Sequence, residues 1–377
     1  MLSNSFFKRI DWLLLLFILP ILSAGLVTMK SFVPDDGGVN FFGRQLIWIA
    51  ISLAVFFAFS FIDFRFLKRT DVLMSLFLFF CGVLAILFVI GHASHGAQKW
   101  LALGGVSIQP ADMMKLVIIL IMAKYFSRRH VEIRDIKHIF ISALYAIIPF
   151  LLVLFQPDFG SALIIFLIWF GMTLVSGISK THLALVAGGG LLIFAVMWFA
   201  VFAPYQKARI VNFIHPLASV QGSGYNALQS TIAVGSGQVF GKGIGFGTQS
   251  RLQFLPEYQT DFIFAAFSEE WGFFGSFVLL LLFGLIIWRI LYNSLLGASN
   301  FEMLFGMGVV IFLISHILIN VGMNIGILPV TGITLPFMSY GGSHLLTEFM
   351  ALGILMSMRG YARSAHRDDV KNEFLGI

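Results

Sequence analysis

The chain has 377 residues, of which 59% are hydrophobic and only 11% are charged. A soluble domain carries about 25% charged residues, so this composition excludes a globule that exposes most of its surface to water. The single cysteine, Cys81, excludes a disulfide-rich secreted scaffold. The net charge of +6 does not indicate a nucleic-acid partner, because the basic residues gather at the ends of apolar runs. The composition therefore indicates a polytopic membrane protein.

Ten apolar stretches follow one another along the chain and are the candidate membrane spans. A spanning helix needs about 20 predominantly apolar residues. The predicted spans are residues 12–29, 46–62, 72–91, 110–126, 138–156, 160–176, 182–203, 262–290, 303–323 and 344–358. The eighth span is long because Glu269 and Glu270 interrupt its first turns. The sequence therefore predicts an all-α polytopic membrane protein, with about ten transmembrane helices in a single domain over residues 1–377.

The basic residues set the predicted orientation, because cytoplasmic connections carry an excess of Lys and Arg. With the N-terminus inside, the inner connections hold 15 of the 24 basic residues and the outer connections hold seven. Both termini are therefore expected to face the cytoplasm. No cleavable signal peptide is expected, because the first apolar run is long enough to span and no small-residue cleavage site follows it.

The connection between the seventh and eighth spans, residues 204–261, is much longer than the others. Loops of more than about 15 residues are usually functional or disordered. This one is not low-complexity disorder, since it contains apolar residues such as Ile210 and Phe254 and six glycines between Gly235 and Gly247. Glycine permits positive φ angles and close backbone approach. We therefore expect a large extracytoplasmic loop that folds back onto the membrane as short helices and tight turns.

Polar residues also occur in the shorter connections on the predicted outer side. Lys99 and Trp100 precede the fourth span, and Asp112 and Lys115 lie three residues apart in its first turns. Asp112 and Lys115 share one face of the helix, so they form an ion pair or Lys115 faces a polar cavity. Asp158, between the fifth and sixth spans, makes a turn that stops one helix and starts the next, or it points into the same cavity.

The long loop ends at Asp261, where the chain enters the eighth span. One interpretation is that Thr260 or Asp261 simply caps this helix. The other is that Asp261 is a partly desolvated carboxylate at the membrane interface that accepts a proton during catalysis.

The last outer loop, residues 324–343, carries no charge and is rich in helix breakers such as Pro329 and Pro336. Non-helical backbone near a membrane survives only when it is buried in protein or lines a cavity. We therefore expect this loop to shape the wall of a groove. Glu348, in the last span, is expected to be paired within the bundle, although an intramembrane role stays open.

Four stretches, taken together and in order, resemble the SEDS family (shape, elongation, division, sporulation) of FtsW and RodA proteins. They are residues 99–115, 156–160, 236–265 and 328–343. The short N-terminal tail is more similar to RodA. The resemblance implies a peptidoglycan glycosyltransferase of the bacterial cytoplasmic (inner) membrane, which polymerises lipid II into β-1,4 glycan strands at the outer face for cell elongation and shape. It also implies a class B penicillin-binding protein as partner.

The essential extracellular aspartate of this family lies in a Thr-Asp-Phe-Ile-Phe stretch, which implies that Asp261 is the catalytic residue here. Two positions depart from the family pattern. Asp112 stands where Glu is common, and Lys99 stands where Arg is usual before the tryptophan. Both keep the charge, but Lys lacks the bidentate phosphate recognition of Arg.

Asp261 is therefore the candidate general base for the 4-hydroxyl of the acceptor sugar. The candidate substrate-binding residues are Lys99, Trp100, Asp112, Lys115, Asp158, Arg209, Lys242, Glu257, Ser339 and Ser343. Basic side chains would neutralise the departing pyrophosphate. A divalent cation, Mg or Mn, held by Asp261 and Asp158 would do the same. No organic cofactor is expected.

Two other functions fit parts of the pattern. A transporter that flips lipid II would suit the charged residues in the spans, Lys115 and Glu348. The distinctive residues cluster on one side, however, whereas transporter sites usually lie near the membrane midplane. The third alternative is a scaffold without chemistry that holds a cell-wall synthase in place.

Overall fold

The structure is a computed structural model that describes residues 9–31, 40–90, 92–94, 97–103, 106–128, 136–215 and 223–375. Within these residues each of the ten predicted stretches coincides with a helix. The helices are α2 (Trp12–Ser31), α3 (Phe41–Phe61), α4 (Thr70–Ile90), α5 (Pro110–Ser127), α6 (Ile136–Phe155), α7 (Phe159–Val175), α8 (Lys180–Val196), α12 (Ile263–Leu295), α13 (Asn300–Asn324) and α14 (Gly342–Leu375). The predicted all-α polytopic class is confirmed.

Seven of the described helices are long and apolar enough to cross a membrane. The seven are α2, α3, α4, α6, α8, α12 and α13. Helix α7 is apolar but has only 17 residues. Helix α5 carries three charged residues, Asp112, Lys115 and Lys124. The chain is therefore a multi-pass membrane protein, and the number of ten spans stays a prediction.

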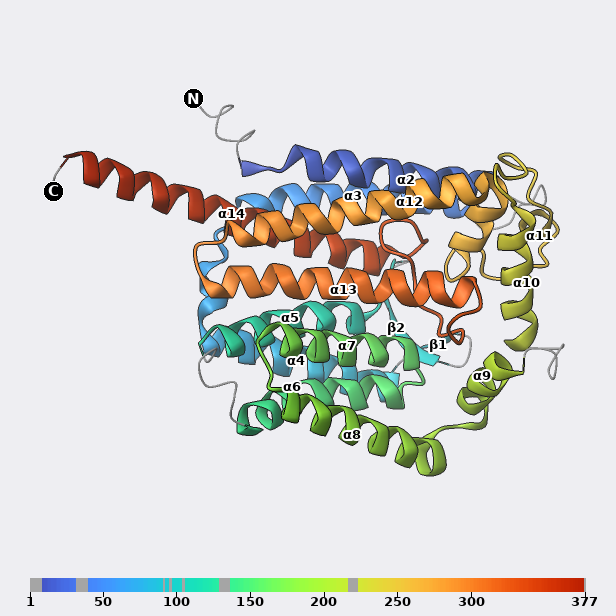
Figure 1. Cartoon of the computed structure of the whole chain (residues 1–377), viewed down its shortest axis with the longest axis horizontal. Coiled ribbons are helices and arrows are strands. Elements are labelled where there is room, and N and C mark those ends of the chain that lie inside the picture. The colour runs from blue at the N-terminus through green and yellow to red at the C-terminus, as the bar shows by residue number, and fades with distance from the viewer. Residues whose placement is uncertain are drawn as a thin grey trace.

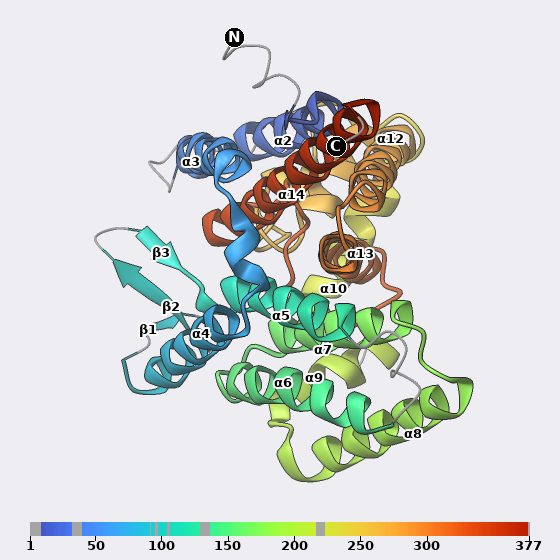
Figure 2. The ribbon, with the colours of Figure 1, turned by 90° about the vertical axis from the view of Figure 1, so that its left-hand side faces the viewer.

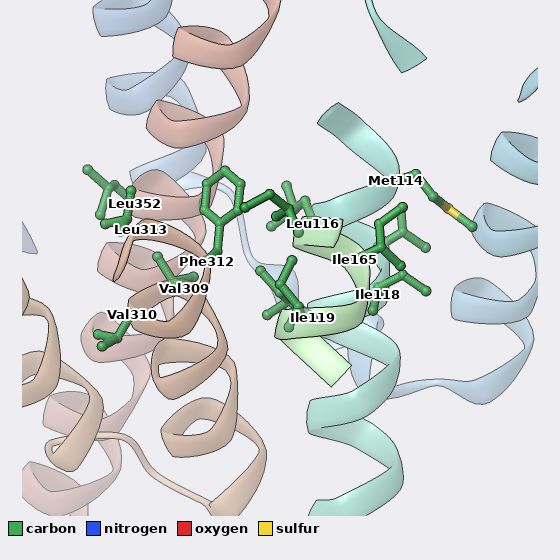
Figure 3. Packing of buried hydrophobic residues seen from close by; sticks show 14 of the residues in the cluster. Met114, Leu116, Ile118, Ile119, Ile165, Val309, Val310, Phe312, Leu313 and Leu352 are labelled. Carbon is green, nitrogen blue, oxygen red and sulfur yellow. The ribbon is translucent and has the colours of Figure 1, made fainter. Parts of the chain in front are cut away.

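Helix α13 lies in the middle of the bundle, between α2, α3, α12 and α14 on one side and α4 to α8 on the other (Figure 2). In the apolar stretch of α13 that is long enough to cross a membrane, 72% of the residues are buried, as expected for a helix that is apolar around most of its circumference. Phe312 and Val309 of α13 face Leu116 and Ile119 of α5 (Figure 3). Gly308 permits this approach, because a Cβ there would lie 2.5 Å from the Ile119 side chain. The core is thus organised around α13.

The two ends of the bundle differ (Figure 1). The start of α2 and the end of α14 lie at one end. The long connection lies at the other end and forms three short helices, α9 (Pro204–Ile214), α10 (Ser223–Ser236) and α11 (Thr248–Arg251). The same end carries a small antiparallel sheet in the order β1-β2-β3, with strands His92–Ser94, Ala97–Leu103 and Val106–Ile108. The sheet was not predicted, because runs this short give no clear alternation of apolar and polar residues.

Helix α12 is broken near its start, close to the interruption that Glu269 and Glu270 predict. The break falls at Gly272, whose φ of 66° and ψ of −165° are not helical. The glycine-rich part of the long connection supplies the missing backbone partners. Phe273 N donates to Gln238 O at 2.8 Å, and Lys242 N donates to Glu269 O at 3.0 Å. The broken helix and the loop therefore form one unit.

Candidate active site

Asp261 lies in a tight turn that leads into α12. The backbone N–H groups of Thr260 and Phe262 donate to the Glu257 carbonyl at 3.1 and 3.2 Å. Helix α12 begins after Phe262, whose side chain makes no capping hydrogen bond. The Asp261 side chain is half-buried. Within the same turn, burial raises the pKa of the Tyr258 hydroxyl.

Two buried asparagines of α13 fix the backbone at Asp261. Asn320 and Asn324 both donate from Nδ2 to the Asp261 carbonyl, at 2.9 and 3.1 Å. Asn320 Nδ2 also donates to Ile333 O at 2.6 Å, and Asn324 Oδ1 accepts from Ala265 N at 3.1 Å. Spaced four residues apart, the two amides share one face of the helix. The sequence analysis missed them, although two asparagines at this spacing in an apolar span are a readable signal.

The last outer loop packs directly against the Asp261 turn. Ser339 Oγ donates to Thr260 O at 2.7 Å, and Tyr340 N donates to Gln259 O at 2.8 Å. Gly332 faces the carboxylate, since a Cβ at this position would lie 3.2 Å from Asp261 Oδ2. The loop and the aspartate, which are about 70 residues apart in the sequence, therefore build one site, as two of the resembling stretches suggest.

Arg209 of α9 reaches the same loop from the long connection. Its Nη1 donates to Thr331 O at 3.3 Å, one residue before Gly332. Standard bond lengths and these contacts place the guanidinium within about 11 Å of the Asp261 carboxylate. A small hollow of about 20 Å³ lies beside Arg209 and is lined mainly by apolar side chains, among them Phe202 and Ile210. Arg209 therefore lies beside apolar surface as well as beside the loop.

Asp158 lies behind the loop rather than in an open cavity. Its Oδ2 accepts from Gln109 Nε2 at 2.6 Å, and its Oδ1 accepts from Ser161 N at 3.3 Å, which caps α7. The predicted turn is therefore confirmed. Ser343 Oγ accepts from Gln109 N at 3.1 Å, so Ser343 belongs to the same buried group. This turn touches the loop, because a Cβ on Gly160 would lie 2.9 Å from Thr331 O.

Asp112 and Lys115 form the ion pair that their spacing predicts. Lys115 Nζ lies 2.9 Å from Asp112 Oδ1, and both side chains are buried. Another buried group adjoins the pair, since His344 Nδ1 lies 3.7 Å from Asp112 Oδ1. His344 Nε2 in turn lies 2.9 Å from Glu348 Oε1. Glu348 is therefore paired within the bundle, as expected.

The remaining candidates lie away from Asp261 or are engaged elsewhere. Lys242 Nζ pairs with the fully buried Glu269 at 2.7 Å and donates to Thr248 Oγ1 at 2.8 Å. It therefore holds the glycine-rich loop to α12. Glu257 is exposed and accepts from Thr260 Oγ1 at 3.1 Å. Trp100 is half-buried on β2, and the side chain of Lys99 lies outside the described part of the structure.

The same contacts bear on whether Asp261 and Asp158 form a metal site. The described residues contain no group of three or more His, Cys, Asp or Glu side chains placed to hold an ion. Asp158 is buried, and both of its oxygens already accept hydrogen bonds from Gln109 and Ser161. The metal prediction for Asp261 and Asp158 stays a prediction.

Comparisons with known proteins identify close relatives over most of the chain. The sequence model of the FtsW/RodA/SpoVE family, described as cell cycle protein, matches residues 7–364. Stage V sporulation protein E of Bacillus subtilis (strain 168) is 34% identical over 362 residues, which cover 94% of this chain and 98% of that protein. Peptidoglycan glycosyltransferase MrdB of Escherichia coli (strain K12) is 37% identical over 273 residues, 72% of this chain and 74% of that protein.

Two solved structures share the fold. A chain from a peptidoglycan synthase complex, described as coordinating polymerization and crosslinking, superposes with a TM-score of 0.78 at 28% identity. The match covers 93% of this chain and 98% of that chain. The crystal structure of the rod shape determining protein RodA of Thermus thermophilus superposes with a TM-score of 0.69 at 28% identity, over 93% of this chain and 96% of RodA.

Proposed function

Because the chain belongs to the SEDS family of FtsW, RodA and SpoVE, we propose that it is a peptidoglycan glycosyltransferase that polymerises lipid II with Asp261 as its general base. The observation that carries the assignment of Asp261 is the way its turn is held. Its carbonyl accepts from two buried asparagines, and the last outer loop binds the two residues before it. A catalytic carboxylate needs this kind of rigid support to stay in a productive geometry.

The reaction follows from these positions. The Asp261 carboxylate accepts the proton of the acceptor sugar's 4-hydroxyl while the hydroxyl oxygen attacks C1 of the donor. The bond between C1 and the pyrophosphate oxygen breaks, and the electron pair leaves with undecaprenyl pyrophosphate. Attack opposite the leaving group inverts the α-linked donor to a β-1,4 product. Arg209, which lies beside the same loop, neutralises charge on the departing pyrophosphate.

Several of the other candidate substrate-binding residues differ in the role that their positions support. The ion pair of Asp112 and Lys115 and the buried Asp158 support the loop wall from behind. Trp100 and Glu257 lie on the outer connections, where a polar disaccharide-pentapeptide would approach, whereas Ser339 is buried and holds the Asp261 turn. Lipid II combines such a polar head with a long lipid, so its substrate site needs both a polar loop cluster and an apolar hollow.

The active site is proposed to lie on the extracytoplasmic side of the bacterial cytoplasmic membrane, with both termini inside. The excess of basic residues in the connections at the opposite end supports this orientation. In the structure the start of α2 and the end of α14 lie opposite α9, α10 and α11 (Figure 1). Membrane-impermeant labelling of a cysteine introduced at Glu257, after Cys81 is replaced by Ser, should succeed in intact cells; labelling only after lysis would reverse the orientation.

A divalent cation and a protein partner belong to the same proposal. Asp261 would hold Mg or Mn, with the remaining ligands supplied by phosphate oxygens and water, as is usual for Mg at phosphate sites. The cation would supply counter-charge for the pyrophosphate; chelation should lower activity and re-addition of the metal should restore it. A class B penicillin-binding protein is the proposed partner, supported by the likeness to a chain of a peptidoglycan synthase complex. Co-purification from the native membrane tests the pairing.

Asp261→Asn tests the function and the base together. The variant keeps the shape of the side chain and the backbone bonds to Asn320 and Asn324, but its amide does not accept the proton. Loss of a general base costs about 10²–10⁴-fold in rate. Purified full-length protein should build glycan ladders from lipid II, and the variant should not, at an unchanged melting temperature. Ladders of normal length from Asp261→Asn would contradict the assignment.

A further inference from the structure

Phe337, in the last outer loop, has a backbone conformation that needs external support. Its φ is 59°, and it is not a glycine. A bulky residue in this region is strained and persists only where its surroundings fix it. The ring is buried, so moving it out of place would also expose apolar surface. The backbone N–H of Phe337 donates to Glu348 Oε2 at 3.0 Å, which identifies Glu348 as its support.

Glu348 lies in α14 and is itself held by the buried imidazole ring of His344. A carboxylate at this depth is costly unless it has partners. His344 Nε2 lies 2.9 Å from the second carboxylate oxygen, Oε1. The His344 ring stacks on His316 of α13, with centroids 4.3 Å apart and planes 28° apart. His316 Nδ1 lies 3.1 Å from Thr334 O, so this group contacts the loop at a second point.

The same loop also forms hydrogen bonds with the turn that contains Asp261. Two and three residues after Phe337, Ser339 Oγ donates to Thr260 O at 2.7 Å and Tyr340 N donates to Gln259 O at 2.8 Å. These bonds fix the two residues that immediately precede Asp261. The contacts therefore run without a gap from Glu348, through the strained turn, to the backbone of the proposed base.

We propose that Glu348, held by His344, is a positioning residue that sets the place of the Asp261 carboxylate through the turn at Phe337. The proposal rests on the assignment of Asp261 as the base, but it concerns a residue in the interior of the bundle that touches no substrate. Asp112 belongs to the same support, since it contacts His344 as well as Lys115.

Two substitutions of Glu348 distinguish the loss of the hydrogen-bond acceptor from a change in the volume of the side chain. Glu348→Met keeps a similar volume but leaves the Phe337 N–H buried without an acceptor. Glu348→Gln keeps an oxygen that accepts this hydrogen bond. With purified full-length protein, Glu348→Met should lower kcat about 10- to 100-fold, because small misplacements of catalytic groups have effects of this size, with KM for lipid II within about twofold. Glu348→Gln should stay within about threefold of the wild type.

Glu302→Met is the matched control. Glu302 is also a fully buried, paired carboxylate, but it lies in the first turn of α13, at the opposite end of that helix from the loop, and contacts Lys68 and Ser299. This variant should lose stability in the same way as Glu348→Met and keep its kcat. Equal loss of kcat in both Met variants, or in Glu348→Gln, would overturn the proposal.

Amide hydrogen exchange of the same proteins gives a readout that does not depend on activity. In Glu348→Met, exchange in residues 335–340 and 257–262 should become about tenfold faster, because local opening follows the loss of the supporting contact. It should not change in Glu302→Met or Glu348→Gln. Unchanged exchange in Glu348→Met would overturn the positioning role, whereas an inactive wild type with the expected exchange pattern would contradict only the proposed function.

Discussion

Gly332 shows how one missing side chain shapes the active site. Its φ is 75°, a value that side-chain-bearing residues rarely adopt, and a Cβ there would lie 3.2 Å from Asp261 Oδ2. The absence of a side chain leaves room beside the carboxylate, where the proposed mechanism places the incoming hydroxyl. The same residue follows Thr331, whose carbonyl accepts from Arg209. Gly332 therefore separates the proposed base from the proposed pyrophosphate contact.

Gly332→Ala should lower kcat/KM at least about tenfold, because the methyl group strains the backbone and crowds the carboxylate. Gly326→Ala is a close control. Gly326 has a φ of 77°, and its Cβ would also meet an oxygen at 3.2 Å, but that oxygen belongs to Thr231. Both variants should lose similar stability in a thermal melt, and only Gly332→Ala should lose polymerase activity. Similar activity in the two variants would show that Gly332 matters for folding alone.

At this scale the sequence predicts some residues well and others poorly. The turn at Asp158 and the ion pair of Asp112 and Lys115 could be predicted, because a local motif or a helical spacing contains them. Lys242 was expected near pyrophosphate, but it pairs with Glu269, 27 residues further along the chain. That pairing depends on how the loop returns to α12, which no local pattern contains. The spacing of Asn320 and Asn324 is visible in the sequence, but the partners of Asn320 are not, since they are backbone carbonyls of two other segments.

At the scale of the elements, helix α12 and the glycine-rich loop, residues 235–247, depend on each other for backbone hydrogen bonds. At the break, Phe273 N and Phe274 N donate to carbonyls of the glycine-rich loop at 2.8 and 3.0 Å. Buried backbone groups must find partners, most of all near a membrane. The loop approaches so closely that a Cβ on Gly272 would lie 2.3 Å from Gly241 N. The position therefore accepts only glycine.

Gly272→Ala should lower the melting temperature by about 5 °C or more, or prevent folding, because both the positive φ and the backbone contact exclude a side chain. Gly284→Ala provides the comparison within the same helix. Nothing lies within 4 Å of a Cβ at Gly284, so this change should leave stability unaltered or raise it slightly. Thermal unfolding of the two purified variants tests this prediction. Equal melting temperatures would mean that the break at Gly272 is not required for stability.

Most of the helices could be predicted from the sequence, because a membrane helix is encoded by a long apolar run. The interruption of α12 was readable from its two glutamates, whereas the partners of the broken backbone were not. The three strands between α4 and α5 escaped prediction, since they are only three to seven residues long. Such short strands are stabilised by packing against neighbouring segments, and the sequence of the strand alone does not show this packing.

On the scale of the whole molecule, one buried carboxylate joins three helices that are far apart in the sequence. Asp11, just before α2, lies 2.6 Å from Arg289 of α12 and 3.3 Å from Arg359 of α14. It also accepts from Asn293 Nδ2 at 2.7 Å. These contacts lie at the end of the bundle opposite the Asp261 turn. They close the bundle where its first and last helices meet.

The Asp11 contacts make stability depend on pH in a defined direction. Burial alone would raise the pKa of Asp11, but the hydrogen bonds from Arg289 and Asn293 and the charge of Arg359 outweigh it and lower this pKa below its ordinary value. A depressed carboxylate pKa stabilises the folded state above the unfolded value of about 3.9, and this contribution is lost as the pH falls further. Asp11→Asn should therefore lower the melting temperature by about 5 °C at pH 7, since it breaks a buried ion pair.

The difference between the wild type and Asp11→Asn should be the same at pH 7 and at about pH 5, and it should narrow below about pH 4 as Asp11 of the wild type becomes protonated. Asp63→Asn is the matched control, because the ion pair of Asp63 with Arg65 is exposed, with 51% and 68% of the two side chains accessible. Exposed pairs contribute little, so its melting temperature should change by about 1 °C at most. Polymerase activity should stay near the wild-type level in both variants, since neither residue contacts the active-site loop. A difference for Asp11→Asn that persists unchanged to pH 3 would mean that packing, rather than the charge of Asp11, joins the three helices.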